Sequence, residues 1–264
     1  MPAVHPQFEQ LQADAWQYQW EPGSFAGRII MVTGAGDGIG RAAALALGKA
    51  GATVILLGRT QEKLEQVYDQ ILAEGGAKPA MVPANLEVTT AANFEELAGL
   101  LMDEFGHLDG LLHNASVLGD LTPLDTYGYG TWDTVMQVNV NAAFYLTRAL
   151  LPLLRAADHA SVVFTSSSVG RQGRAFWGAY AVSKFATEGL MQVLADELEN
   201  TTQVRVNSLN PGGTRTRMRA LAYPGEDPQT LRTPEQILPV YMYLLGAASV
   251  GITGQAFDAQ PPRG

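Results

Sequence analysis

Cysteine is absent from this sequence of 264 residues, and histidine occurs only four times. Without cysteine the chain can form no disulfide bond, thiolate nucleophile or cysteine-based metal site. The histidines are scattered, at His5, His107, His113 and His159, whereas a histidine-rich metal site needs several of them together. The sequence therefore predicts that the protein uses no metal ion.

An excess of positive charge is missing as well. The chain has 17 lysines and arginines against 26 aspartates and glutamates, and the net charge of −9 disfavours binding to nucleic acid. The N-terminus lacks the basic start and apolar core of a signal peptide. The longest uncharged run, residues 237–257, could cross a bilayer by its length but is interrupted by Pro239 and three glycines. We therefore expect a cytoplasmic protein that binds neither nucleic acid nor membrane.

The composition is typical of a large globular domain, with 47% hydrophobic and 16% charged residues. We divide the chain into an N-terminal arm, residues 1–24, and a single domain, residues 25–264. The arm contains four aromatic residues among polar ones and ends in a turn-forming Glu-Pro-Gly-Ser segment. These aromatic residues predict that the arm docks onto the domain or onto a neighbouring subunit.

From residue 28 onward, apolar runs of strand length alternate with helical patterns. Strands are predicted within residues 28–33, 53–58, 79–85, 108–116, 160–168, 204–210 and 254–259, and helices within 38–51, 60–76, 90–106, 132–154, 180–199 and 234–246. Such alternation is typical of a parallel sheet that is covered on both faces. The predicted fold class is therefore α/β: a doubly wound, seven-stranded parallel sheet with helices on both faces, in three α/β/α layers.

A glycine-rich turn follows the first predicted strand directly. Residues 33–40 read TGAGDGIG, with Gly34, Gly38 and Gly40 between the strand and the next helix. Glycines in this context let the backbone approach a pyrophosphate at a helix N-terminus, and a mere tight turn would not need three of them in this order. We predict a Rossmann-type dinucleotide site, in which Asp37 and Ile39 of the same turn also contact the cofactor.

The end of the second predicted strand bears on the choice of cofactor. An acidic residue there would bind the ribose 2′-hydroxyl of NAD, whereas arginine accommodates the 2′-phosphate of NADP. This chain has Arg59 after the strand and no carboxylate, and a guanidinium can hold a phosphate through several hydrogen bonds. NADP(H) is therefore the preferred cofactor, and NAD(H) stays open if Arg59 is only a solvated loop residue.

Tyr180 and Lys184 lie one helical turn apart in the segment GAYAVSKFATEG, residues 178–189. Side chains at positions i and i+4 are about 5–6 Å apart at Cβ, and a neighbouring ammonium lowers the pKa of a phenol from its usual value of about 10. The pair could therefore provide a proton donor that is usable near neutral pH. Taken alone, the pair is better explained as an interfacial tyrosine beside a lysine whose charged end reaches solvent.

Further motifs follow along the chain. HNAS occupies residues 113–116, PGGTRT occupies residues 211–216, Asn139 lies in MQVNVNAAF, and Ser167 precedes the tyrosine by thirteen residues. Together with the glycine turn and the Tyr180–Lys184 pair, these motifs resemble those of the short-chain dehydrogenase/reductase family over residues 25–259. The segments around Ser167 and residues 210–220 also look like one bacterial branch of that family, the YciK-like oxidoreductases.

The resemblance implies a role for each matching residue. Tyr180 would exchange a proton with a carbonyl oxygen, and Ser167 would hydrogen-bond that oxygen. Lys184 would lower the tyrosine pKa and hold the nicotinamide ribose, while Asn139 would position a water between Lys184 and solvent. The further cofactor contacts that it implies are Asn85, Asn114, Ala115, Pro211, Gly212, Thr214 and Thr216.

The chain departs from the family pattern at two places. His113 and Ser116 replace the outer residues of the usual N-N-A-G, and Asn85 stands where the family commonly has an aspartate. An amide at Asn85 can still hydrogen-bond the adenine. We therefore expect that neither departure affects the reacting atoms.

The resemblance implies an NADP(H)-dependent oxidoreductase that transfers hydride between nicotinamide and the carbonyl or secondary alcohol of a small molecule. The Tyr-x-x-x-Lys spacing favours this chemistry over enoyl reduction, and little sequence remains after residue 259 for the substrate region of an epimerase. The alternative is a catalytically silent NADP-binding sensor or scaffold protein. Such relatives generally lose the tyrosine or the lysine, which this chain keeps.

The substrate pocket is expected between the segment 168–179 and a lid at residues 213–232. Arg171 and Arg174 in the first segment would favour a polar or anionic substrate, unless they pair with nearby acids. The substrate itself is not determined by the sequence.

The predicted helices 132–154 and 180–199 carry more apolar residues than one sheet face needs: Val135, Val138, Ala142, Phe144, Leu146, Ala149, Ala186, Leu190, Met191 and Leu194. The resemblance implies that these helices pair between subunits in a homodimer or homotetramer. The alternative is that the aromatic arm covers this surface and keeps the chain monomeric.

Overall fold

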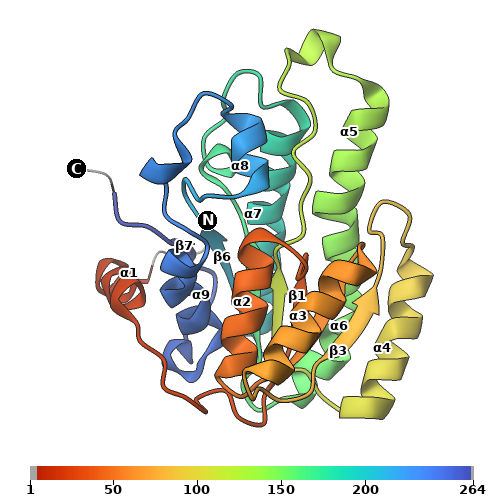
Figure 1. Ribbon diagram of the computed structural model, residues 1–264, viewed down its shortest axis with the longest axis vertical. Helices are drawn as coiled ribbons and strands as arrows, with labels where there is room; N and C mark the ends of the chain where they lie inside the picture. Colours follow the sequence, from red (N-terminus) through yellow and green to blue (C-terminus); the bar gives the residue numbers. More distant parts are fainter. Residues whose placement is uncertain (1–4, 263–264) are drawn as a thin grey trace.

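The computed structural model describes residues 5–262 and shows a parallel sheet between two layers of helices (Figure 1). The sheet has seven strands in the order β3-β2-β1-β4-β5-β6-β7. The strands are β1 (Ile29–Thr33), β2 (Thr53–Gly58), β3 (Ala80–Pro83), β4 (Gly110–His113), β5 (Ser161–Thr165), β6 (Arg205–Asn210) and β7 (Ala256–Asp258). The predicted fold class is confirmed. Because the strand order reverses between β1 and β4, a crevice opens beyond their carboxyl ends.

Alternate residues of each central strand enter two separate cores. Ile30 and Val32 of β1 pack under α2 (Gly38–Lys49), α3 (Gln61–Ala73) and α9 (Leu238–Leu245). Ile29 and Met31 pack under α4 (Ala91–Phe105), α6 (Ala142–Ala156) and α7 (Gly178–Glu199) on the other face. The unbroken apolar strands of the sequence are therefore buried on both sides, as parallel strands generally are.

The helix predicted at residues 132–154 is interrupted in the structure. It consists of α5 (Tyr129–Met136), a π-helical turn (Gln137–Asn141) and α6. Single π turns inserted into helices occur frequently at functional sites. Asn139 lies in this turn, so the interruption changes the direction of the one predicted catalytic residue that this segment carries.

The N-terminal arm forms a helix, α1 (Phe8–Gln17), which lies outside α9 at the β7 edge of the sheet (Figure 1). Phe8 packs edge-on against Phe257 with ring centroids 5.1 Å apart. The Trp16 indole donates a hydrogen bond of 2.7 Å to the Asp258 carbonyl. Residues 8–20 therefore dock onto the chain's own domain, while residues 1–4 of the predicted arm lie outside the described residues.

The apolar surplus predicted for the two long helices is largely absent. Most of the apolar residues named for them are buried inside the chain: Val135, Val138, Ala142, Leu146, Met191 and Leu194. The helical spacing of these residues in the sequence could not show which of them would be buried. In the structure α6 and α7 each contact other helices as well as the sheet, so more than one side of each helix is covered. Of the residues named, Phe144 is exposed, and the other exposed large apolar residues on these helices are Val182, Phe185 and Val193.

Among residues 5–262, no helix has both the length and the apolar character that crossing a bilayer requires. The same part of the chain contains no group of three histidine, aspartate or glutamate side chains placed to hold a metal ion.

Candidate active site

A large cleft, with a volume of about 1020 Å³, lies beyond the carboxyl ends of the strands. It brings together nearly all residues that the sequence predicts as catalytic or cofactor contacts: Gly34, Asp37, Gly38, Ile39, Arg59, Asn85, Asn114, Ala115, Ser167, Tyr180, Lys184, Pro211, Gly212, Thr214 and Thr216. Gly40 and Asn139 are buried behind its wall. Residues far apart in the sequence thus face one space that can hold a dinucleotide and a small molecule.

The glycine turn between β1 and α2 leaves the helix N-terminus open to the cleft. Gly34 and Gly38 have left-handed backbones, with φ of 69° and 52°, which side chains other than glycine rarely adopt. A methyl group at Gly40 would overlap the Gly34 carbonyl and the Asn114 amide. Asp37 caps the helix by accepting a 2.8 Å hydrogen bond from the Gly38 amide. The turn therefore fits a pyrophosphate group at a helix N-terminus.

The loop after β4 is held close to the end of β1 by one hydroxyl. Thr33 Oγ1 accepts hydrogen bonds of 3.0 Å from the backbone amides of both Asn114 and Ala115. The Asn114 side chain donates a 3.3 Å bond to the Thr33 carbonyl. These contacts place Asn114 and Ala115 at the switch point of the sheet, where the cofactor of this fold binds.

His113, one of the two departures in the HNAS motif, belongs to the core. Its ring stacks on Phe164 with centroids 4.7 Å apart, and Nε2 lies 2.7 Å from Thr147 Oγ1. Because that hydroxyl donates its own proton to the Ala143 carbonyl, it accepts from His113, which is neutral with the proton on Nε2. Burial and the nearby Lys184 lower the His113 pKa to about 3.

Tyr180 is buried at the inner end of the cleft, beside Ser167. Burial raises the pKa of the Tyr180 phenol to about 12, and a hydrogen bond with the Ser167 hydroxyl opposes this rise. The sequence predicted the opposite shift, because the i+4 spacing shows a nearby ammonium but not the loss of solvent around the phenol. In the structure desolvation outweighs the hydrogen bond with Ser167.

Lys184 points under the tyrosine ring and is also buried. Its ammonium donates a 2.8 Å hydrogen bond to the Thr165 carbonyl at the end of β5 and lies 5.6 Å from the centre of the Tyr180 ring. Burial lowers the pKa of Lys184 to about 8, although Glu188, one turn further along α7, raises it. The lysine is therefore mostly charged at neutral pH and loses its charge just above it.

Asn139 clamps the loop after β4 from behind the cleft wall. Its Oδ1 accepts a 2.8 Å hydrogen bond from the Val117 amide, and its Nδ2 donates bonds of 3.0 Å to the Val117 carbonyl and to Ser183 Oγ. Ser183 in turn donates to the Tyr180 carbonyl at 2.7 Å. The asparagine side chain thus connects the loop to the helix that carries Tyr180.

The outer end of the cleft carries two exposed ion pairs. Arg59 contacts Glu87 at 3.2 Å, and Lys63 on the first turn of α3 pairs with Asp37. Lys63 and Glu87 were not identified from the sequence. Arg59 precedes the N-cap of α3, so no helical spacing relates it to Lys63, and only the closeness of Lys63 to the end of β2 in the sequence could have suggested it. Asn85 lines the same end, and its Oδ1 accepts from the Glu87 amide at 3.2 Å.

The PGGTRT loop after β6 is held by the last described part of the chain. Gln260 Nε2 donates hydrogen bonds of 2.8 and 2.9 Å to the carbonyls of Pro211 and Gly213. Thr216 caps α8 (Arg217–Ala222) by accepting from the Arg219 amide at 3.2 Å. This loop and α8 line the cleft next to the glycine turn, since a Cβ atom at Gly38 would lie 3.5 Å from the Thr216 side chain.

The space next to Tyr180 has an aromatic wall rather than a cationic one. The Trp177 ring lies 5.7 Å from the Tyr180 ring and 5.8 Å from the Tyr223 ring, between centroids. Arg171 does not line the cleft, because Glu188 and Asp258 bind its guanidinium. Arg174 donates to the Tyr223 hydroxyl at 3.2 Å. The expectation that Arg171 favours an anionic substrate is therefore wrong.

A comparison with protein-family models decides the family. The model described as "short chain dehydrogenase" matches residues 28–227. The chain belongs to the short-chain dehydrogenase family. This confirms the resemblance seen in the motifs and makes the protein an oxidoreductase by family.

Similar proteins of the family come from enteric bacteria. The uncharacterized oxidoreductase YciK of Escherichia coli K12 is 58% identical over 236 residues, which cover 89% of this chain and 93% of that one. The crystal structure of a short-chain dehydrogenase from Shigella flexneri, complexed with NADP, is 56% identical, with a TM-score of 0.89 over 91% of this chain and all of that one. A structure from Escherichia coli CFT073, complexed with NADPH, gives the same identity, TM-score and coverage.

Proposed function

We propose that the protein transfers hydride between NADP(H) and the carbonyl carbon, or secondary alcohol carbon, of a small molecule, with Tyr180 as the general acid and base. The observation that carries this proposal is the convergence of Ser167, Tyr180 and Lys184 at the buried inner end of one cleft. The same cleft begins at a glycine turn that fits a pyrophosphate.

The outer end supports NADP(H) over NAD(H). Arg59 and Lys63 bring two positive charges to the place where the second strand ends, and they are balanced only by exposed carboxylates. A 2′-phosphate can replace those carboxylates, since exposed ion pairs contribute only about 0–1 kcal/mol. Relatives that are more than half identical crystallise with NADP and with NADPH, which supports the same assignment.

The chain's own groups then handle the proton. Bound NADPH supplies the hydride that a carbonyl carbon accepts. The phenol of Tyr180, whose pKa is about 12 in the free protein, holds its proton at neutral pH and donates it to the carbonyl oxygen. The Ser167 hydroxyl donates a hydrogen bond to the same oxygen as its charge develops. The Lys184 ammonium stabilises the phenolate that remains.

The walls around Tyr180 favour a substrate with an apolar, flat body. Leu118, Trp177, Met218 and Tyr223 line this part of the cleft. The arginine nearest to them on α8, Arg219, is bound by both carboxylate oxygens of Glu226 at 2.6 and 2.7 Å. A carbonyl compound that stacks on Trp177 would fit this surface better than a small anionic one.

Oxidation of NADPH in the presence of a panel of ketones, quinones and diketones tests the proposal. The wild-type protein should oxidise NADPH with some members, whereas Tyr180→Phe should turn over at least about 100-fold more slowly, the scale of a lost general acid. The variant should bind NADPH with unchanged affinity, because the phenol acts on the substrate. If NADPH binds but no carbonyl compound in the panel oxidises it, the sensor or scaffold function is favoured instead.

We also propose that the protein is a homodimer or homotetramer. The exposed apolar residues Val182, Phe185 and Val193 of α7, with Phe144 of α6, form the surface for this contact. Light scattering at micromolar concentration should give a multiple of the chain mass of 28.3 kDa. A mass equal to that of one chain would contradict the assembly.

A further inference from the structure

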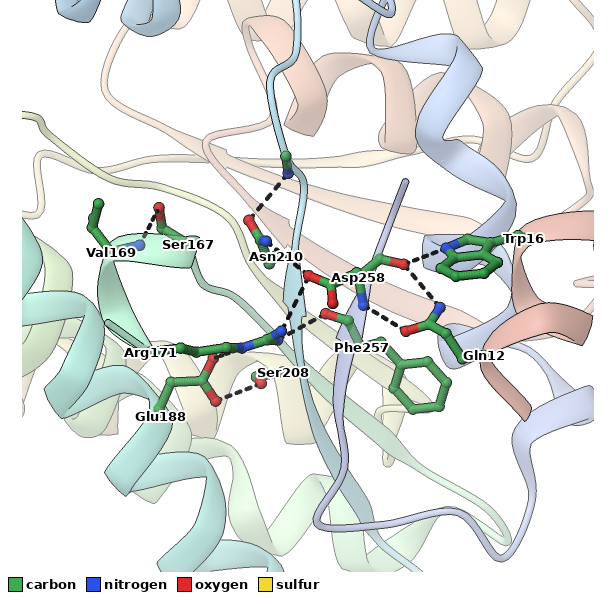
Figure 2. Close-up of polar contacts among 11 residues, drawn as sticks. Gln12, Trp16, Ser167, Val169, Arg171, Glu188, Ser208, Asn210, Phe257 and Asp258 are labelled. Carbon is green, nitrogen blue, oxygen red and sulfur yellow. Dashed lines mark hydrogen bonds and ion pairs between the residues drawn. The ribbon is translucent and has the colours of Figure 1, made fainter. Parts of the chain in front are cut away.

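Arg171 anchors the segment that connects Ser167 to α7. Its Nε donates a 3.1 Å hydrogen bond to Glu188 Oε1, its Nη1 donates at 3.1 Å to Asp258 Oδ1, and its Nη2 donates at 2.8 Å to the Phe257 carbonyl (Figure 2). All three guanidinium nitrogens are therefore used, on two different elements. A planar guanidinium with this many partners fixes the direction of the backbone that carries it.

The two carboxylates that bind Arg171 are themselves fixed by groups of the site. Glu188 lies on α7 one turn after Lys184, and its second oxygen accepts from Ser208 Oγ at 2.7 Å. Asp258 Oδ1 also accepts from Asn210 Nδ2 at 2.8 Å. Asn210 begins the loop on the other side of the cleft, where its Oδ1 accepts from the Gly212 amide at 3.1 Å. One guanidinium thus connects the serine segment, the tyrosine helix and the PGGTRT loop.

Helix α1 holds Asp258 from the outside of the sheet. The Asp258 amide donates to Gln12 Oε1 at 2.7 Å, and the Asp258 carbonyl accepts from Gln12 Nε2 at 2.9 Å and from Trp16 Nε1 at 2.7 Å (Figure 2). β7 is the edge strand, and these backbone groups point away from β6. The Gln12 carboxamide satisfies them as a neighbouring strand would. Neither Gln12 nor Trp16 lines the cleft.

We propose that α1 positions the active site through the Arg171 network, which consists of Gln12, Trp16, Arg171, Glu188 and Asp258. Gln12 and Trp16 fix the backbone of Asp258, Asp258 and Glu188 fix Arg171, and Arg171 fixes the segment that begins at Ser167. Arg171 and Asp258 are positioning residues for hydride transfer. This inference rests on the proposed function, since the serine that is positioned acts there on the carbonyl oxygen.

Without the network, the segment that begins at Ser167 could shift, and the size of that shift decides how much the rate falls. A misplacement of a reacting group by about 1 Å can cost about 100-fold in rate. Loss of the network would therefore lower kcat. The Kd for NADPH would rise by a smaller factor than kcat falls, because the network reaches the expected cofactor contacts only through Asn210 and the loop that follows it, whereas the glycine turn and the outer ion pairs are held by other partners.

Two substitutions on one helix provide the test. Gln12→Leu removes the carboxamide that pairs with Asp258, whereas Gln10→Leu changes an exposed residue whose side chain donates a 2.8 Å hydrogen bond to Asp14. For the carbonyl compound that the wild-type protein turns over fastest, Gln12→Leu should lower kcat by about tenfold or more. Its KM and its Kd for NADPH should rise by a smaller factor than kcat falls, at a temperature well below its melting point. Gln10→Leu should match the wild-type protein in all three.

A second pair of variants separates positioning from loss of fold. Trp16→Phe keeps an aromatic side chain, although a smaller one, and removes the indole donor, so it should fold and show a smaller loss of kcat in the same direction. Arg171→Lys can still bind one carboxylate and should retain more of kcat than Arg171→Gln. If Gln12→Leu and Trp16→Phe both keep the wild-type kcat, the proposal is overturned.

Hydrogen–deuterium exchange gives a readout that does not depend on any substrate. In Gln12→Leu, the backbone amides of residues 168–172 and 211–213 should exchange about tenfold faster than in the wild-type protein or in Gln10→Leu. Equal exchange in all three proteins would overturn the coupling even if the wild-type protein reduces a carbonyl. Faster exchange without any NADPH oxidation would keep the coupling and contradict the proposed function instead.

Discussion

At the inner end of the cleft, Tyr180 and Lys184 are only 8% and 4% exposed, whereas at the outer end the side chains of Arg59 and Asp37 are 66% and 60% exposed. Lys184 is fixed by a hydrogen bond to a strand carbonyl. At the outer end, Arg59 pairs with Glu87 and Asp37 pairs with Lys63, and both ion pairs are exposed to solvent. Burial thus shifts the pKa values of Tyr180 and Lys184 strongly at the inner end, whereas at the outer end the hydrogen bond with Lys63 lowers the pKa of Asp37.

This difference indicates two separate tasks. Buried groups with few alternatives keep one geometry, which proton transfer requires. Exposed ion pairs are weak and can be exchanged for another anion at little cost. We therefore expect changes at the inner end to affect turnover, and changes at the outer end to affect which cofactor binds.

The largest effect is expected at Lys184, where the two tasks meet. Lys184→Ala removes the charge that stabilises the Tyr180 phenolate and a contact for the cofactor. We expect kcat/KM to fall by about 1,000-fold, with a weaker Kd for NADPH in fluorescence titrations. Lys63→Ala is the matched control at the outer end and should change only the Kd. Wild-type turnover in Lys184→Ala would remove the inner end from the mechanism.

A smaller effect is expected at Arg59. Arg59→Ala should weaken NADPH binding by about 1–3 kcal/mol, the scale of a charge-assisted hydrogen bond, while NADH binding changes much less. Arg41→Ala, which removes a guanidinium that contacts Gln70 on α3, serves as the control for a general loss of positive charge. Calorimetric titration with both cofactors measures the difference. Equal losses for NADPH and NADH would rule out the 2′-phosphate contact.

The smallest effect concerns pH. Burial lowers the Lys184 pKa to about 8, so the ammonium is charged below that pH and becomes neutral above it. The affinity for NADPH should therefore decrease as the pH rises through about 8, by up to about tenfold for the loss of one charged hydrogen bond. Lys184→Arg keeps its charge and should show a flat profile over the same range. A flat wild-type profile would show that Lys184 does not change its charge there.

The sequence was sufficient for features that depend on local patterns. The strands, the glycine turn and the Tyr-x-x-x-Lys pair are all short-range patterns, and the structure contains them at the expected places. The doubly wound parallel sheet followed from the strict alternation of strands and helices, whereas the order of its strands comes from the structure.

Features that depend on burial or on distant partners could not be predicted. The π turn at Asn139 has no periodic signature, and the rise in the Tyr180 pKa reflects the removal of solvent by the whole fold. Arg171 contacts an aspartate 87 residues further along the chain, so its role could not be separated from that of a substrate-binding arginine. The same limit applies to Lys63, whose partner Asp37 lies 26 residues earlier, at the N-terminus of α2.

The most direct test of the account is the fate of a labelled hydride. The wild-type protein is incubated with NADPH that carries deuterium at the transferred position. The second reactant is the carbonyl compound that gives the fastest oxidation of NADPH. The account predicts an alcohol that carries one deuterium on the former carbonyl carbon, with formation slowed in Tyr180→Phe but the same label in the product. NADPH oxidation that leaves no deuterium on that carbon would contradict hydride transfer to a carbonyl at the inner end of the cleft.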